Sequence, residues 1–251
     1  MRSLAHIICS LLLLCGVSHA QRKTAIFMAD GFDFPVGKPD GEGYYKARGY
    51  TPNGHLGEDW NGRGGGDTDL GAPVYSTAHG LVLFAKNYYH GWGNVVIIRH
   101  AYQEGGQTKF VDSLYGHLDQ IHVRYGQHVK RGQQVGTIGT GGGLYPAHLH
   151  FEMRKDIRVG MARHAFPKDD SVYWSGTDFI NARRKLAPSA ATVLAPIDTF
   201  SAATGKAETI SPEGGFVLPT PKPSSPSAPG STVPGRYDDL RKMLEEQKKS
   251  K

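Results

Sequence analysis

Residues 146–154, with the sequence PAHLHFEMR, carry two histidines and a glutamate at every second position. Side chains of a β-strand alternate between its two faces, so a strand here would project His148, His150 and Glu152 together from one face and the apolar residues between them into a core. Two imidazoles and a carboxylate on one surface could bind a metal ion or transfer protons. The same pattern is typical of a half-buried strand with a solvated polar face, so this segment alone does not decide its chemistry.

Two other segments contain residues of the same chemical types. His55 and Asp59 lie in the sequence NGHLGEDWNG, whose glycines and asparagines favour a loop or a strand end over a helix. His117 lies at the end of a mostly apolar segment, in SLYGHLDQ. Each segment, taken alone, is also consistent with an ordinary polar turn or a surface histidine.

The elements that must position these residues are short β-strands. The 33 glycines among 251 residues are nearly twice the usual share of roughly 7%, and glycine-rich turns separate segments rich in Val, Ile, Tyr and Phe. We predict strands at 72–76, 81–86, 94–100, 109–117, 134–138 and 148–154. A short helix is expected at about 177–184, capped by Ser175 or Thr177. The sequence therefore predicts a mainly β fold, a compact antiparallel β-sandwich with a short C-terminal helix.

The first 20 residues have the composition of a secretory signal peptide. A basic start, an apolar run over 7–17 and small residues before Ala20 predict cleavage after Ala20. The run is too short for about 30 Å of hydrocarbon, so we expect no stable membrane insertion and a location outside the cytoplasm, either secreted or in the periplasm and cell envelope. Cys15 follows a leucine, which disfavours a lipoprotein. Both cysteines, Cys9 and Cys15, lie in this segment, so any metal in the exported chain must be held by His, Asp or Glu.

The C-terminal part of the chain differs in composition. Residues 188–234 are rich in Pro, Ser, Ala, Thr and Gly and lack the apolar density for a core, which predicts a flexible linker after a domain at 21–187. Residues 235–251 form a charged tail with apolar residues at helical spacing, a possible short helix. The net charge of +6 suits an anionic envelope polymer, a nucleic acid or a membrane surface, and does not choose between them.

Taken in order, the motifs resemble the lysostaphin/LytM family of zinc metallopeptidases, which cut peptidoglycan cross-links. The resemblance covers about residues 32–155 and rests on His55-Leu-Gly-Glu-Asp59, Asp69-Leu-Gly-Ala-Pro-Val-Tyr75, Tyr115-Gly-His117-Leu118, Gly132-Gln-Gln-Val-Gly136 and His148-Leu-His150-Phe-Glu152. It implies a peptidase domain with a substrate groove. A glycine-rich insertion after Asp59 departs from the family pattern and leaves the shape of that groove open.

The resemblance also implies a division of roles among the five polar residues. His55, Asp59 and His150 would bind zinc, and a water would take the fourth position. His117 and His148 would be the catalytic pair, one moving a proton from the water to the leaving amine and the other stabilising the oxyanion. The sequence leaves open which histidine has which role.

Several other residues take less specific interpretations. Glu58 and Glu152 are interpreted as solvated or as supporting a ligand, with Glu152 a candidate for orienting a histidine. Asp67 and Asp69 offer too few carboxylates for a good calcium site. The aromatic residues that could either line the cleft or pack are Tyr88, Tyr89, Trp92 and Tyr145. The histidines interpreted as surface or packing residues are His79, His90, His100, His122, His128 and His164.

We therefore expect a secreted zinc metalloendopeptidase that hydrolyses peptide bonds in the stems or cross-bridges of peptidoglycan. Its partner would be the wall peptide and not a nucleic acid, and its oligomeric state is open. The alternative is a non-catalytic envelope protein that binds wall peptides or activates another wall hydrolase. A protein substrate is a third possibility.

Overall fold

The computed structural model describes residues 21–52, 54–88, 91–159, 161, 169–187 and 191–198. The predicted signal peptide, most of the predicted linker and the predicted terminal helix lie outside these residues. Within them, no helix is both long enough and apolar enough to cross a membrane.

The main sheet has eight antiparallel strands in the order β2-β3-β10-β7-β6-β5-β8, with β11 also paired to β10. Its strands are β2 (Tyr44–Arg48), β3 (Glu58–Gly62), β5 (Gly80–Asn87), β6 (Asn94–Glu104), β7 (Gln107–Leu118), β8 (His128–Val129), β10 (Leu149–Arg154) and β11 (Tyr173–Trp174). Two small two-stranded sheets join β1 (Lys23–Phe27) to β12 (Thr192–Pro196) and β4 (Pro73–Tyr75) to β9 (Gln134–Thr137). The prediction of a mainly β, antiparallel fold is confirmed.

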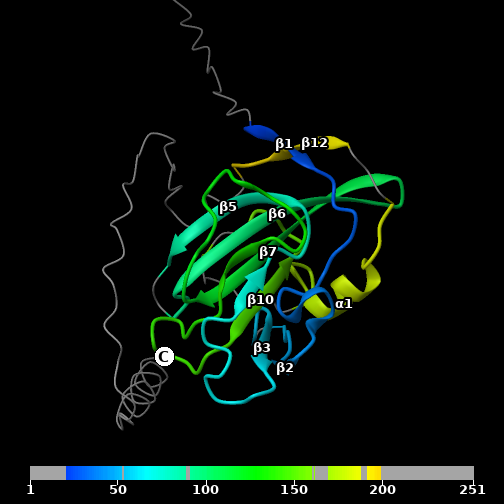
Figure 1. Ribbon diagram of the computed structural model, residues 1–251. Coiled ribbons are helices and arrows are strands. Elements are labelled where there is room, and N and C mark those ends of the chain that lie inside the picture. The colour runs from blue at the N-terminus through cyan, green and yellow to red at the C-terminus, as the bar shows by residue number, and fades with distance from the viewer. Residues whose placement is uncertain are drawn as a thin grey trace, which may run out of the picture.

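Two short helices complete the fold. The π-helix η1 (Gly37–Gly41) precedes β2, and α1 (Gly176–Ala182) follows β11 and packs against β10. Ser175 is the N-cap of α1, and its side chain accepts a hydrogen bond from the backbone N–H of Asp178. Figure 1 shows the β1–β12 ribbon at one end of the molecule and β2 and β3 at the other.

The apolar residues of β10 lie in the core as predicted. Leu149, Phe151 and Met153 are fully buried in the main hydrophobic cluster, which also contains residues from β6 and β7. The opposite face of β10 is also buried, because Glu152 is 0% and Arg154 is 1% exposed. The alternative of a solvated polar face is therefore wrong. A buried row of charged side chains must be compensated by partners, and those partners are described with the site.

All six predicted strands are present, with ends that differ by at most four residues from the prediction. The strands that the prediction missed are β1, β2, β3, β8, β11 and β12. Four of these lack a clear period-two signal, because β2 and β3 are mostly polar without regularly spaced apolar residues, and β8 and β11 span only two residues each.

The predicted linker is wrong for residues 192–196, which form β12. This strand pairs along its whole length with β1, and Ala195 and Val193 pack with Ile26 and other apolar residues of β5 and β6. Arg22 and Asp198 close the ribbon with an ion pair of 2.6 Å. The low apolar content of the segment predicted a linker. A two-stranded ribbon that packs on an existing sheet needs few apolar residues, so composition does not distinguish it from a linker.

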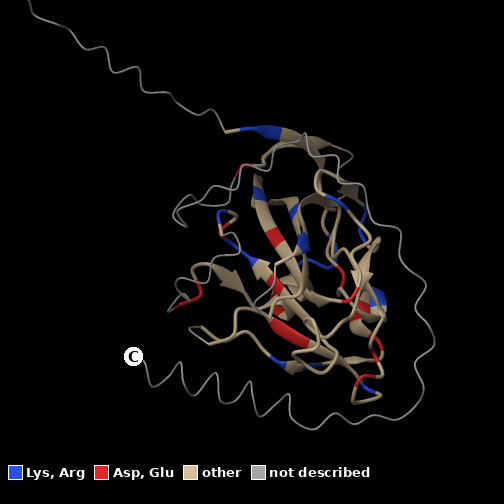
Figure 2. Ribbon diagram, turned by 90° about the vertical axis from the view of Figure 1, so that its left-hand side faces the viewer, with Lys and Arg blue, Asp and Glu red and all other residues tan. Residues whose placement is uncertain are grey.

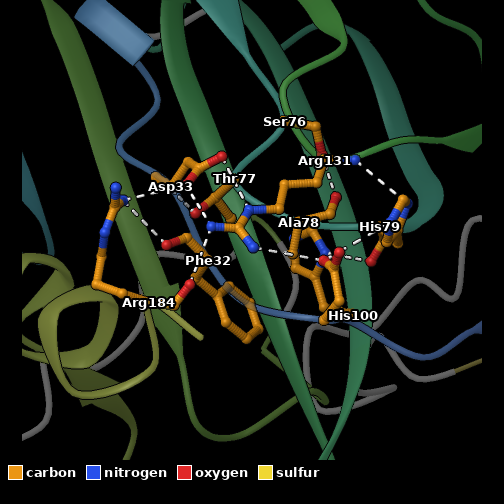
Figure 3. Close-up of polar contacts among 10 residues, drawn as sticks. Phe32, Asp33, Ser76, Thr77, Ala78, His79, His100, Arg131 and Arg184 are labelled. Carbon is orange, nitrogen blue, oxygen red and sulfur yellow. Dashed lines mark hydrogen bonds and ion pairs between the residues drawn. The ribbon is translucent and has the colours of Figure 1, made fainter. Parts of the chain in front are cut away.

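A polar cluster fixes the segment before η1 to the rest of the domain. The Arg131 guanidinium donates to both carboxylate oxygens of Asp33 at 2.8 and 2.5 Å, and Arg184 lies 3.1 Å from the same carboxylate. Figure 3 shows the two arginines on either side of Asp33, and also His79 and His100 beside them. His100 is a buried packing residue, as interpreted from the sequence.

Candidate metal centre and cleft

Three strands bring the candidate residues together. Asp59 on β3 and Gly116 on β7 are both paired with His150 on β10, one on each side. His117 follows Gly116 directly, at the end of β7. His55 lies just before β3, and His148 lies just before β10 in a bridge with Gly139. Segments that are about 90 residues apart in the chain thus meet at one point of the sheet.

Three potential ligand atoms converge. Nε2 of His55 lies 3.1 Å from Nδ1 of His150 and 3.1 Å from Oδ1 of Asp59, and Nδ1 of His150 lies 2.9 Å from the same oxygen. Tetrahedral zinc with bonds of about 2.0–2.1 Å would hold its ligand atoms roughly 3.4 Å apart. Among the described residues, these three form the group of His, Cys, Asp and Glu residues that could hold a metal ion.

When both rings are neutral, as metal ligands are, the hydrogen bonds on the far side of each ring leave the converging nitrogens without protons. The Nδ1–H of His55 donates to the Gly49 carbonyl at 2.9 Å, and the Nε2–H of His150 donates to Glu152 at 3.0 Å. Two nitrogen lone pairs and a carboxylate oxygen then face one another, an arrangement that a cation stabilises. The donor set fits zinc, which binds histidine and carboxylate ligands in this number.

The charge balance at the ligands favours a cation in the same way. Burial opposes ionisation of Asp59, but hydrogen bonds from His150 and His55 outweigh it and hold the pKa of Asp59 well below its usual range. Burial also opposes a charge on His150, whereas its bonds to Asp59 and Glu152 raise the pKa of this histidine to about 9. Without a metal ion, a proton on His150 would supply the positive charge that the two carboxylates attract.

Behind His150 runs a row of buried charges of alternating sign. Glu152 accepts from Nε of Arg154 at 2.6 Å, and Arg154 lies opposite Asp112 in the β10–β7 ladder. Asp112 accepts two hydrogen bonds from Arg99 on β6, at 2.7 and 2.6 Å. Figure 2 shows both acidic and basic segments within the strands of the sheet. The interpretation that Glu152 orients a histidine agrees with this geometry.

Arg99 connects this row to the periphery of the domain, because its guanidinium also donates to the carbonyls of Pro196 on β12 and of Ile157. Burial raises the pKa of Asp112 although Arg99 opposes this. Burial also acts most strongly on Glu152, but Arg154 and His150 together outweigh it and lower the pKa of Glu152. The ion pairs are thus needed to keep these carboxylates charged in the interior.

Glu58 has a different role from its neighbour Asp59. It is 1% exposed, accepts from the backbone N–H of Thr177 at 3.0 Å and pairs with Lys46 at 3.3 Å. The interpretation of Glu58 as solvated is wrong, because this carboxylate stabilises the N-terminus of α1. Asp67 and Asp69 accept from the backbone N–H groups of Ala147 and Gly62, and do not converge on a common ion.

His117 and His148 lie beside the three potential ligands, with ring centroids 4.8 Å apart. Nδ1 of His117 faces the Trp92 carbonyl at 3.3 Å, and Nδ1 of His148 faces the Pro146 carbonyl at 2.8 Å. No described residue forms a hydrogen bond with Nε2 of either ring, and Nε2 of His148 lies within ion-pair distance of Asp59, 3.7 Å from its Oδ1. Burial, with His150 and His148 nearby, lowers the pKa of His117 to about 3, so this ring is neutral.

A cleft of about 250 Å³ opens over these residues. Besides the five polar residues it is lined by Arg48, Gly54, Leu56, Gly91, Trp92 and Tyr145. Trp92 and Tyr145 thus line the cleft, whereas Tyr88 packs against Phe84 and Tyr89 lies outside the described residues. Arg48 is not among the predicted site residues, because nothing in the sequence indicates that β2 reaches the site.

Comparison with known proteins places this site in a family. The model of peptidase family M23 matches residues 55–162, which include all five polar residues. Lipoprotein NlpD of Yersinia enterocolitica is 38% identical over 84 residues, which are 34% of this chain and 78% of that protein. The chain belongs to peptidase family M23.

Three other curated relatives are longer than this chain and have different names. Cell division protein DipM of Caulobacter vibrioides is 42% identical over 84 residues, and peptidoglycan DD-endopeptidase ShyB of Vibrio cholerae is 41% identical over 86 residues. Each match covers 34% of this chain, but only 13% of DipM and 18% of ShyB. The NlpD protein of Escherichia coli, 38% identical over 34% of this chain and 20% of its own length, is called a murein hydrolase activator.

Among solved structures, a zinc-containing peptidase from Vibrio cholerae is 33% identical. The match has a TM-score of 0.40 and covers 50% of this chain and 37% of that one.

Proposed function

We propose that this chain is an exported zinc metalloendopeptidase that hydrolyses peptide bonds in the stems or cross-bridges of peptidoglycan. The observation that carries the proposal is the convergence of His55, Asp59 and His150 beside two further histidines, in a cleft of a peptidase-family domain. The name of the relative ShyB, a peptidoglycan DD-endopeptidase, supports the wall peptide as substrate.

When bound, zinc would supply a Lewis acid that polarises the scissile carbonyl and makes a water more acidic. The remaining work falls to His117 and His148. A neutral ring with a free Nε2 takes a proton from the attacking water and later gives it to the leaving amine. The other ring stabilises the negative charge that develops on the carbonyl oxygen. The backbone carbonyls of Trp92 and Pro146 fix the orientation of both rings.

Digestion of purified peptidoglycan tests the proposal directly. The zinc-loaded chain should release new amino termini, whose assignment identifies the bond, and a chelator should abolish the release. His117→Ala and His148→Ala should keep zinc and fold, yet lose on the order of 10²–10⁴-fold in turnover. Wild-type rates in both variants would contradict the catalytic roles.

A second candidate is a non-catalytic protein that activates another wall hydrolase. The name of the Escherichia coli NlpD protein favours it, whereas the complete set of five polar residues favours an enzyme. Zinc-loaded protein that releases no amino termini alone, but increases release by a separate wall hydrolase, would establish this second function. Export through the predicted signal peptide at residues 1–20 is part of both candidates, and amino-terminal sequencing of the exported form tests it.

A further inference from the structure

Arg48 is the one lysine or arginine among the described residues that line the cleft. It is the last residue of β2, which is the edge strand of the main sheet, and its side chain is exposed. No described residue forms an ion pair or a hydrogen bond with its guanidinium. Lys46 on the same strand differs, because its amino group is held by Glu58 and Thr177.

A β-bulge directs Arg48 towards the cleft. Lys46 lies opposite Trp60 in the β2–β3 ladder, so a regular ladder would place Ala47 opposite Asp59. The register instead shifts by one residue and places Arg48 opposite Asp59. Residues that lie directly opposite share a face of the sheet, so the extra residue moves Arg48 to the face of the potential metal ligand.

The charge of Arg48 is not neutralised in the cleft. Asp59 is the only carboxylate among the lining residues that the structure describes, and it is already bound to His55 and His150. Opposite side chains in an antiparallel ladder have Cβ atoms about 4.5–5.5 Å apart, and an extended peptide advances about 3.3 Å per residue. A substrate group that binds Arg48 therefore lies near the bond at the centre of the cleft.

We infer that Arg48 binds a carboxylate of the peptide substrate close to the scissile bond, so that the cleft selects peptides with a free carboxylate there over neutral ones. The planar guanidinium can donate two parallel hydrogen bonds to a carboxylate, which is the anion that peptides carry. This inference rests on the proposed function, because it concerns the peptide that the cleft would hydrolyse.

The test compares matched substrates. Cross-linked peptide fragments of peptidoglycan are divided, and the carboxylates of one half are converted to carboxamides with ammonia and a carbodiimide. The zinc-loaded wild type should hydrolyse the free acids with a kcat/KM about 10- to 100-fold higher than the amides. In Arg48→Met, kcat/KM on the free acids should fall by that factor, and kcat/KM on the amides should change by less than about twofold. In Arg48→Lys, kcat/KM on the acids should lie between the values of the wild type and Arg48→Met, because lysine lacks the planar guanidinium.

Arg63→Met is the matched control, because Arg63 is exposed, does not line the cleft and carries the same charge. It should retain the full preference for the acids. Equal hydrolysis of acids and amides by the wild type, or an equal loss on both in Arg48→Met, would overturn the inference while hydrolysis itself stands.

Calorimetry separates this inference from the proposed hydrolysis. If the wild type cleaves neither substrate, binding of both to the zinc-loaded protein is measured. A preference for the acids that Arg48→Met removes would support the carboxylate site and reject only catalysis. Equal binding, or no binding, would overturn the inference together with the proposed function.

Discussion

His150 and Asp59 lie directly opposite each other on the neighbouring strands β10 and β3, with 2.9 Å between Nδ1 and Oδ1. The pairing register of two strands thus sets the distance between two potential metal ligands. A slip by one residue would turn one of the two side chains to the other face of the sheet. Gly116 lies opposite His150 on the other side, and a Cβ added there would make ordinary van der Waals contacts of 3.5 Å with His150 and Trp92.

Removal of one ligand should abolish metal binding. The wild type should hold about one zinc per chain, and Asp59→Ala and His150→Ala should lose it, because two protein ligands bind zinc far more weakly than three. Metal analysis after dialysis measures this, with His122→Ala, a change at an exposed histidine, as control. Full zinc occupancy in both ligand variants would reject the assignment.

The buried row behind His150 should affect both stability and metal affinity. Arg154→Met leaves the buried Glu152 without its arginine partner, while Asp112 keeps Arg99, and should destabilise the fold by about 3 kcal/mol or more. Glu152→Gln should weaken zinc binding by about 10- to 100-fold, because the neutral amide is a weaker hydrogen-bond acceptor for the Nε2–H of His150 than the carboxylate is. Chemical denaturation and zinc titration measure the two effects.

A double variant distinguishes a specific ion pair from general disruption of the core. Glu152→Gln combined with Arg154→Met removes both charges, so the free energy of unfolding should recover part of the loss seen in Arg154→Met. Strictly additive destabilisation would show that the two side chains do not interact.

His100 should make the fold sensitive to mild acid. Burial lowers the pKa of His100 to about 4, whereas an unfolded chain would have a histidine pKa of about 6.5. Between these values the unfolded chain takes up a proton and the folded chain does not, so stability is fully present above pH 6.5 and falls as the pH drops towards 4. At pH 5 the loss is about 2 kcal/mol.

Denaturation curves at pH 7 and pH 5 measure this dependence. Between pH 7 and pH 5 the free energy of unfolding should fall by about 2 kcal/mol less in His100→Gln than in the wild type. This difference does not depend on the absolute stability of the variant. His122→Gln, at an exposed histidine, should behave as the wild type does. The same pH dependence in His100→Gln and wild type would show that other groups cause it.

The strand β12 should be required for full stability. A chain that ends at residue 187 lacks the partner of β1 and the Pro196 carbonyl that Arg99 binds, and should lose about 2–4 kcal/mol, the order expected from exposing the apolar residues under the ribbon. A chain that ends at residue 198 keeps both. Thermal unfolding of the two chains provides the comparison, and equal midpoints would mean that the ribbon contributes nothing.

The sequence by itself determined the parts of this protein that depend on local pattern. Alternation in residues 148–154 predicted which side chains of β10 enter the core, and the apolar segments between glycine-rich turns predicted six strands. The ordered motifs identified the five polar residues and the family. These features can be read locally because side-chain direction in a strand has a fixed period and turns require particular residues.

Only the tertiary structure decided how the polar residues are supported. The burial of Glu152 and Arg154 depends on the row of charges contributed by β6 and β7, and the strand β12 exists because β1 lies beside it. The entry of Arg48 into the cleft follows from one extra residue in the β2–β3 ladder. Pairing between distant strands sets these relationships, and the sequence of one strand does not predict the register in which it pairs with another.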